Sequence, residues 1–427
     1  MKNLLAVGLI WLGCALAWVI LGSTILVRSG EMSSALSEEV HRLWGPPLQQ
    51  PPPRVLYLER QKRTETVTTQ DSQGRPLVQQ IEKEVPVEVE LPLQSTNASA
   101  RLSLEHRRKG LLWFPTYAVQ FTASYSVSNT TAEQRAITVR LPLASSAGAE
   151  PSAALRESSG PGTTVFDDFV FLDEQGNPQP ATIEQGTASF TRTIAPGGRA
   201  DFTVRYRSRG TSRWFYHPSA GTAQVHNFRL VVHTDFANVD FPAGSLSPSR
   251  HGPVPDGWQG EWQFGSLVAS APIGIELPKR LNPGPLASRM TFFAPVGLLF
   301  YFFVVAVFAA ARQVRFHPLH FFFLGCGFFS FHLLFAYLVD HLPIAPSFLL
   351  SAGVSTLLVI TYARLLVGWR FALLQMGLSQ LIYLVLFSLT FFWEGFTGLA
   401  ISVGAVVTLF VMMQLTGRVR WGDPARA

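Results

Sequence analysis

The residue most unusually placed for chemistry is His332, near the middle of an uncharged, strongly apolar stretch over residues 321–339. An ionisable side chain inside a membrane span is rare, and it is a functional hypothesis by default. The alternative is structural, because a neutral histidine can join two helices through a hydrogen bond worth about 0.6–2 kcal/mol. Side chains that could bond to it lie in neighbouring apolar stretches: Ser351, Ser355, Gln375 and Gln380.

A second group of polar residues lies at the ends of apolar stretches. Asp340 and His341 follow one stretch, and Glu394 lies between two others. If the loops that carry them are neighbours, these side chains could form a small cation or proton site. They could equally be ordinary acidic loop residues on the side of the membrane that lacks basic residues.

Two further sets of side chains suggest metal binding. His317 and His320 could offer two imidazoles, but two ligands alone do not make a metal site, and Pro318 is better explained as a first-turn helix residue. The carboxylates Asp167, Asp168, Asp173 and Glu174 lack the order of a calcium loop, and we expect them at solvated strand ends and in a turn. No P-loop, G-x-S-x-G or H-E-x-x-H motif occurs, so we expect no enzyme, catalytic residue, metal or cofactor.

Long apolar stretches must position these residues. About 20 apolar residues cross a membrane core of ~30 Å, so the pattern predicts an α-helical bundle of one N-terminal span plus five C-terminal spans. The first stretch is longer than the roughly 7–15 apolar residues of a signal peptide, which favours an uncleaved signal anchor. The stretches without Asp, Glu, Lys or Arg are residues 4–27, 291–311, 321–339, 344–362, 371–392 and 395–415.

Arginines predict the orientation of these spans, because cytoplasmic loops carry an excess of basic residues. With the N-terminus inside, the second, fourth and sixth spans end at arginines, whereas the short loops on the other side carry no Lys or Arg. We therefore expect a multi-pass membrane protein with both termini cytoplasmic and residues 28–290 outside, which in a bacterium means inner membrane and periplasm. The arginines are Arg312, Arg315, Arg364, Arg370, Arg418 and Arg420.

The chain between the first two spans is polar and strand-patterned. Period-two runs separated by Gly/Pro turns predict a large inserted all-β, sandwich-like domain over residues 54–290, with an immunoglobulin-like unit over 125–209. The other expected parts are the anchor 1–27, a juxtamembrane helix and Pro-rich linker 28–53, the five-helix domain 291–415 and a tail 416–427. Whether the β region is one domain or two stays open. Expected strands cover 54–59, 77–90, 117–127, 135–143, 163–172, 188–194, 201–206 and 224–234.

The cysteine positions and the net charge bear on how the β domain is stabilised and on whether the protein binds nucleic acid. Cys14 and Cys326 both lie in predicted spans, so the β domain has no disulfide and depends on its own core. The net charge of +6 comes partly from the cytoplasmic arginines and does not indicate nucleic-acid binding.

Several short motifs resemble the CreD family of bacterial inner-membrane, cell-envelope-integrity proteins, which is associated with colicin tolerance. The segment from Arg315 through His317 and Pro318 resembles the family's Arg-x-His-Pro-Met motif. Gly45 and Pro46 fit the Gly-Pro that closes the family's juxtamembrane helix, and Trp421 fits its terminal Trp. Asp340-His341 and Glu394 lie where the family carries acidic motifs.

The sequence also departs from the family pattern. Gly395 and Phe396 replace the family's second acid and tyrosine, and Arg420 stands where its terminal motif has Asp. Any role that depends on those acids is therefore doubtful in this chain. The resemblance implies the one-plus-five layout but no reaction and no catalytic residues.

Together with the resemblance, which alone implies the envelope role, these observations predict a non-enzymatic inner-membrane protein acting in envelope integrity or stress response. The expected partners are the lipid bilayer and a periplasmic protein or envelope ligand, which the β domain would bind; the oligomeric state is open. The alternative is a transporter or ion-coupled membrane protein that uses His332 and the outer group of Asp340, His341 and Glu394. Against that alternative, the spans show no inverted repeat and no pair broken by Gly or Pro.

Overall fold

A computed structural model describes residues 2–70, 76–143, 164–219, 224–268, 270–312, 314, 316–393 and 395–417. The chain divides into two compact units. The first, here called the helical unit, comprises Met1–Ala35, Gly110–Leu112 and Leu281–Ala427. The second, here called the β unit, comprises Leu36–Lys109 and Trp113–Arg280. Each unit is described by itself.

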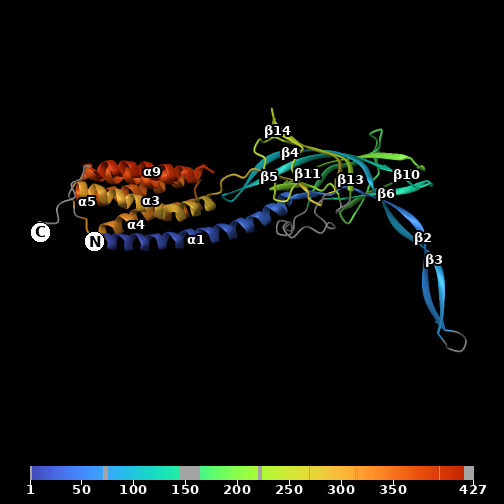
Figure 1. The fold of residues 1–427 in the computed structure, drawn as a ribbon, viewed down its shortest axis with the longest axis horizontal. Helices are drawn as coiled ribbons and strands as arrows, with labels where there is room; N and C mark the ends of the chain where they lie inside the picture. The colour runs from blue at the N-terminus through green and yellow to red at the C-terminus, as the bar shows by residue number, and fades with distance from the viewer. Residues whose placement is uncertain are drawn as a thin grey trace. The chain divides into compact units, whose positions relative to one another are not determined.

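The first helix contributes residues to both units. Helix α1 runs unbroken over Lys2–Trp44, so it joins the predicted span over 4–27 to the juxtamembrane helix predicted within residues 28–53 (Figure 1). No proline interrupts residues 28–44, and Gly30 costs only about 1 kcal/mol relative to alanine inside a helix. The two predicted segments are therefore one element.

The described residues include six helices that are long and apolar enough to cross a membrane. This confirms the predicted arrangement of one N-terminal span plus five C-terminal spans around a β-rich region. After α1 they are α3 (Pro283–Ala311), α4 (Pro318–Leu338), α5 (Ile344–Val367), a composite helix over Trp369–Phe392 and α9 (Thr397–Thr416). The composite helix consists of α6 (Trp369–Phe371), η1 (Ala372–Gly377), α7 (Leu378–Gln380), η2 (Leu381–Leu386), α8 (Phe387–Leu389) and η3 (Thr390–Phe392).

Within the helical unit, α1 packs against α3 and α4. The fully buried Trp18 places its ring edge-on to Phe328 and Phe329 of α4, with ring centroids 6.1 and 5.3 Å apart. The indole N–H of Trp11 donates to the carbonyl of Pro295 in α3 at 2.9 Å. The first span is therefore a packed member of the helical unit.

The described residues of the β unit form three sheets. A three-stranded sheet has the order β1 (Leu48–Gln50), β12 (Arg213–Tyr216), β16 (Ile273–Glu276). A five-stranded sheet has the order β3 (Pro76–Leu91), β2 (Arg54–Gln70), β6 (Arg135–Pro142), β10 (Thr187–Ile194), β9 (Thr182–Glu184). An eight-stranded sheet has the order β14 (Arg250–Val254), β15 (Gly257–Val268), β13 (Gln224–Thr234), β4 (Leu93–Lys109), β5 (Leu112–Ser128), β11 (Arg199–Thr211), β7 (Phe166–Leu172), β8 (Pro178–Gln179).

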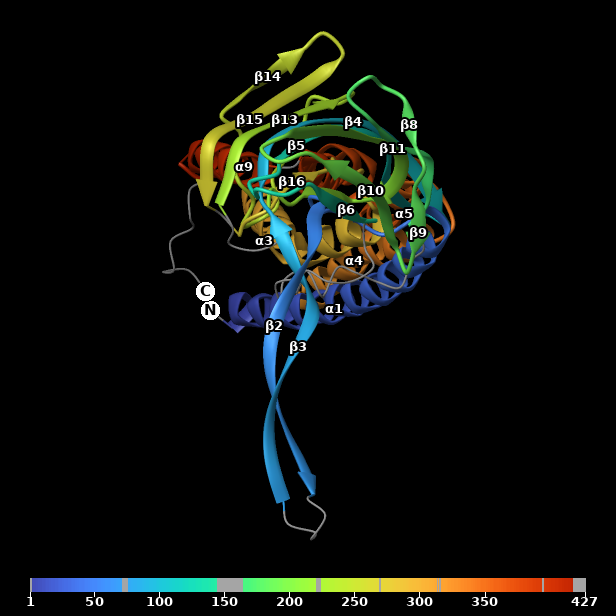
Figure 2. The same ribbon diagram turned by 90° about the vertical axis from the view of Figure 1, so that its right-hand side faces the viewer.

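The two larger sheets pack face to face around one core, as the predicted sandwich-like domain requires (Figure 2). Phe190 of β10 meets Phe171 of β7 at 4.7 Å and Phe202 of β11 at 5.6 Å between ring centroids. Buried and exposed residues alternate along β11 because side chains in a strand point to opposite faces. The strands within residues 125–209 are divided between the two sheets.

Several strands do not follow from the sequence pattern, notably β4 and β15. Strand β4 is rich in small and polar residues, yet it lies between β13 and β5, where Ala98, Ala100 and Leu102 are buried. Its position within the sheet outweighs its weak strand propensity. Strand β15 contains glycines that suggest turns, but Gly260 leaves room for the Trp258 ring, which would lie 2.3 Å from a β-carbon there.

Strands β2 and β3 form a long hairpin that continues beyond the five-stranded sheet (Figure 2). Strand β2 pairs with β6 only over residues 54–57, whereas its pairing with β3 runs from Val55–Leu91 to Gln70–Pro76. The described part of the ribbon is mostly exposed and carries cross-strand ion pairs, Arg60–Glu84 at 3.8 Å and Lys62–Glu82 at 3.7 Å.

Candidate functional site

His332 lies in α4 and is only 2 % exposed. Its ring contacts Phe331 at 4.9 Å and Trp18 at 5.7 Å between centroids. Its Nδ1 atom has no hydrogen-bond partner among the described residues. Aromatic packing between α1 and α4 therefore surrounds this histidine, and none of its predicted polar partners is bonded to it.

Two of those predicted partners bond to each other in a separate place. The side-chain amide of Gln380 donates to Ser355 Oγ at 2.9 Å, and Ser355 Oγ donates to the Gly327 carbonyl at 2.6 Å. Gln380 and Ser355 are fully buried, and this chain of bonds joins α7, α5 and α4. These hydrogen bonds link three helices and leave the acceptor Gln380 Oε1 without a partner among the described residues.

Asp340 forms an ion pair that the sequence did not suggest. Its carboxylate lies 2.8 Å from Arg28 Nη2, and the same nitrogen donates to the Ala336 carbonyl at 2.9 Å. The guanidinium also stacks over the Tyr337 ring at 4.9 Å. Arg28 thus holds α1 against the end of α4. Its guanidinium already pairs with the Asp340 carboxylate, which was one of the groups predicted to bind a cation. His341 is exposed, and Glu394 lies outside the described residues.

The two histidines near the start of α4 have separate partners. His317 precedes the helix and its Nδ1 accepts the backbone N–H of Leu319 at 3.3 Å, while His320 Nδ1 lies 2.8 Å from the Tyr362 hydroxyl. Pro318 is the first residue of α4, as its first-turn role requires. Among the residues that the structure describes, no group of three or more His, Cys, Asp or Glu could hold a metal ion. Arg315 lies outside them.

Gly45 and Pro46 form a close joint between the end of α1 and strand β11. Gly45 closes α1 by donating its N–H to the His41 carbonyl at 2.9 Å, with a φ of +110°. A β-carbon there would lie 3.0 Å from the Arg209 carbonyl oxygen. Thr211 Oγ1 donates to the Gly45 carbonyl at 3.1 Å, and Pro46 is buried. The positive φ and the close approach both require glycine.

Trp44 strengthens this joint in a way the sequence did not predict. The guanidinium of Arg107 lies 3.5 Å from the Trp44 ring centroid, and that of Arg209 lies 5.0 Å from it. Nearby, Lys109 Nζ lies 2.6 Å from Glu39 Oε1. The Trp44 ring thus contacts strands β4 and β11. Trp421 lies outside the described residues.

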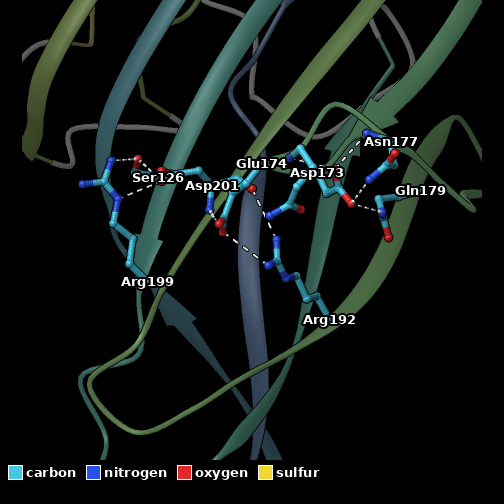
Figure 3. A network of polar contacts seen from close by, with 9 residues as sticks. Ser126, Asp173, Glu174, Asn177, Gln179, Arg192, Arg199 and Asp201 are labelled. Carbon is cyan, nitrogen blue, oxygen red and sulfur yellow. Dashed lines mark hydrogen bonds and ion pairs between the residues drawn. The ribbon is translucent and has the colours of Figure 1, made fainter.

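The acidic pairs of the β unit stabilise turns and strands. Asp173 accepts the backbone N–H groups of Gln175 and Asn177 at 3.0 and 2.8 Å and the side-chain amide of Gln179 at 3.0 Å (Figure 3). The hydrogen bond from the Asn177 backbone contributes most to holding the pKa of Asp173 below its ordinary value. This carboxylate therefore organises the turn between β7 and β8.

A second set of contacts in Figure 3 continues across β11. Glu174 Oε1 accepts the Asp201 backbone N–H at 3.1 Å and lies 3.3 Å from Arg192 Nη2. Arg199 Nε donates to Asp201 Oδ1 at 2.8 Å and its Nη2 donates to Ser126 Oγ at 2.6 Å. Burial acts to raise the pKa of Asp201, but the bonds from Arg199 and Ser126 lower it on balance.

The helices and sheets together define a multi-span membrane protein with a large β-rich region inserted after its first span. The sequence model described as "Inner membrane protein CreD" matches residues 1–422, and the chain therefore belongs to the CreD family. This confirms the resemblance carried by the Gly45-Pro46 and His317-Pro318 motifs.

No curated protein matches the sequence. Among solved structures, a putative nutrient binding protein from Legionella pneumophila is 12 % identical, with a TM-score of 0.30 over 56 % of this chain and 82 % of that one. A mutant M1 zinc metallopeptidase from Deinococcus radiodurans is 9 % identical, with a TM-score of 0.23 over 44 % of this chain and 42 % of that one. The same metallopeptidase with a peptide substrate bound is 8 % identical, with a TM-score of 0.23 over 69 % and 94 % of the two chains.

We expect Gly45→Ala and Gly30→Ala to have opposite effects on thermal stability. Gly45→Ala places a β-carbon at a positive φ and against the Arg209 carbonyl, which should cost roughly 1–3 kcal/mol. Gly30→Ala lies in an open position of α1 and should stabilise the helix by up to about 1 kcal/mol. Thermal unfolding of the full chain in detergent tests both variants. Equal melting temperatures would contradict the role of Gly45.

Acid should loosen the β7–β8 turn through Asp173. Its pKa is lower in the folded chain than the ordinary value of about 3.9, so its contribution is complete above that value and is lost as pH falls through the folded pKa. We expect Asp173→Asn to be less stable than the unaltered chain near pH 6 and to lose less stability on acidification. Melting curves between pH 6 and pH 3 measure this. Asp256→Asn, at an exposed turn, is the control, and parallel profiles for Asp173→Asn and the unaltered chain would refute the assignment.

Proposed function

We propose that this protein maintains the bacterial cell envelope without catalysing a reaction. In this proposal the β unit binds an envelope component or partner protein outside the cytoplasm, and the helical unit holds it at the inner membrane. The observation that carries the proposal is the large folded β unit, inserted in sequence between membrane-capable helices.

The connections between helices favour this distribution of roles. Residues 312–317 join α3 to α4, and Gly368 alone joins α5 to α6. Neither segment has room for a folded domain. A ligand-binding role therefore falls to the β unit, whose two larger sheets share one core.

The orientation rests on the described arginines Arg312, Arg364 and Arg370, which lie at or beside the ends of α3 and α5. The excess of basic residues at cytoplasmic loops assigns these ends to the cytoplasm. The β unit would then be periplasmic. Arg28 is a basic residue on the opposite side, but its charge is paired with Asp340.

Cysteine labelling in cells tests the orientation. With Cys14 and Cys326 replaced by alanine, Asp256→Cys reports on an exposed turn of the β unit and Arg312→Cys on the predicted cytoplasmic side. A maleimide that cannot cross the inner membrane should label Asp256→Cys in cells with a permeabilised outer membrane, and Arg312→Cys only after lysis. The reverse pattern would overturn the proposed periplasmic position.

Ion-coupled transport remains the competing function, because several buried polar atoms of the helical unit, His332 Nδ1 and Gln380 Oε1 among them, have no partner among the described residues. Packing of His332 against Trp18 and Phe331 favours a structural role instead. The two functions differ in their response to substitution of this histidine.

We expect His332→Phe to restore envelope integrity to a strain that lacks this protein, because an aromatic ring can fill the same space between α1 and α4. Survival under detergent stress measures complementation, and thermal unfolding measures folding. Gln380→Leu is the companion variant; it should lower stability by about 1 kcal/mol through loss of the Ser355 bond. A His332→Phe protein that folds normally but fails to complement would support transport.

A further inference from the structure

The exposed face of strands β5 and β11 carries a ladder of polar side chains. Antiparallel pairing sets each β5 residue opposite one of β11, and alternate residues share a face. Four neighbouring pairs on this face are Ser126–Asp201, Ser124–Thr203, Thr122–Arg205 and Gln120–Arg207. We call this set the polar ladder.

In two pairs of the polar ladder, the facing side chains form hydrogen bonds with each other. Ser126 donates to the Asp201 carboxylate, which Arg199 also contacts at 2.8 Å (Figure 3). The hydroxyls of Ser124 and Thr203 lie 2.8 Å apart. These pairs therefore have little hydrogen-bonding capacity left for a ligand.

The other two pairs are different. Arg207 forms an ion pair with Asp168, but among the residues that the structure describes no carboxylate lies within 4.0 Å of Arg205. The side chains of Thr122 and Gln120 likewise have no recorded bond within that part of the chain. Within the described residues, the Arg205 guanidinium is thus a positive charge without a paired carboxylate, on the same face as the Thr122 hydroxyl and the Gln120 amide.

These free groups line a concavity of about 510 Å³. Arg205 and Arg207 contribute to its lining from β11, and Val170 and Leu172 of β7 and Pro178 of β8 add apolar surface. The Asp173 turn holds β8 beside Leu172, because Gln179 bonds to the Asp173 carboxylate (Figure 3). The edge of the concavity is therefore fixed by the network described above.

The backbone beside the concavity is irregular. The β11–β7 pairing shifts register between Arg205 and Arg207, and Asp168, a non-glycine residue, has a φ of +53°. Bulges redirect side chains and are common beside functional sites. Strained backbone of this kind persists where its surroundings hold it, and it gathers at ligand sites. Here the strained residue is the one that pairs with Arg207.

We propose that this concavity binds an oxyanion group, a phosphate or a carboxylate, carried by an envelope ligand. Arg205 supplies the charge and N–H donors, since guanidinium groups match both anions. Thr122 and Gln120 hydrogen-bond to neighbouring polar groups of the ligand, and Val170 and Leu172 pack against its apolar part. This inference deepens the proposed function, because it names the chemistry that the β unit recognises.

Binding to the full chain in nanodiscs of zwitterionic lipid tests the site, with glucose 1-phosphate, glucuronate and glucose as probes. We expect one or both anions to bind at low ionic strength and glucose not to bind. The stronger anion identifies phosphate or carboxylate as the preferred group. Arg205→Gln should weaken anion binding roughly ten-fold or more, the usual effect of losing a charged hydrogen bond.

Arg250→Gln is the matched control, because Arg250 is exposed on β14 at the opposite edge of the same sheet. It should leave anion binding unchanged, and both variants should keep the melting temperature of the unaltered chain. Equal weakening by both substitutions, or no anion binding at all, would overturn the site. If the site fails while complementation of envelope integrity persists, the proposed function stands and only the ligand chemistry is wrong.

Discussion

The docking of α1 is the interaction on which both units depend. In the helical unit, Trp18 packs among the rings of α4, and Arg28 closes the contact by pairing with Asp340. In the β unit, the end of the same helix is fixed by Trp44 and Gly45 against β4 and β11. Backbone groups of a span must bond within the span, so a helix is the form a first span takes in lipid. Side-chain contacts then determine which elements the helix packs against: α4 in the helical unit, and β4 and β11 in the β unit.

The helices and the sandwich were predictable because both rest on periodicity and burial. Uncharged length marks a span, and alternation marks a half-buried strand. Strand β4 was missed because its buried face is made of residues as small as Ala98 and Ala100, which carry little hydrophobic signal. The contacts of Trp44 were missed for another reason. Its partners Arg107 and Arg209 are distant in sequence and meet it only after the strands have paired.

For the polar residues of the helical unit, the sequence indicated which residues matter but not which partners they contact. Gln380 and Ser355 were recognised as interhelical donors or acceptors, but their bond to each other was not. One cause lies in the composite helix, where the π-helical turns η1 and η2 flank α7. Each π turn carries more residues than an α turn, so a count in steps of 3.6 misplaces the face on which a residue lies. His332, by contrast, was found by its position, yet its contact with Trp18 depended on how α1 packs.

The β2–β3 ribbon can vary in length without cost to the core of the β unit. Beyond residue 57, β2 pairs only with β3 in the described chain, so no core residue depends on how far the ribbon extends. Strand side chains repeat every two residues, so removing two facing residues from each strand leaves every remaining side chain on its original face. Each such step would shorten the ribbon by roughly 6–7 Å. Related chains could therefore differ in reach through paired insertions and deletions while keeping the same sandwich.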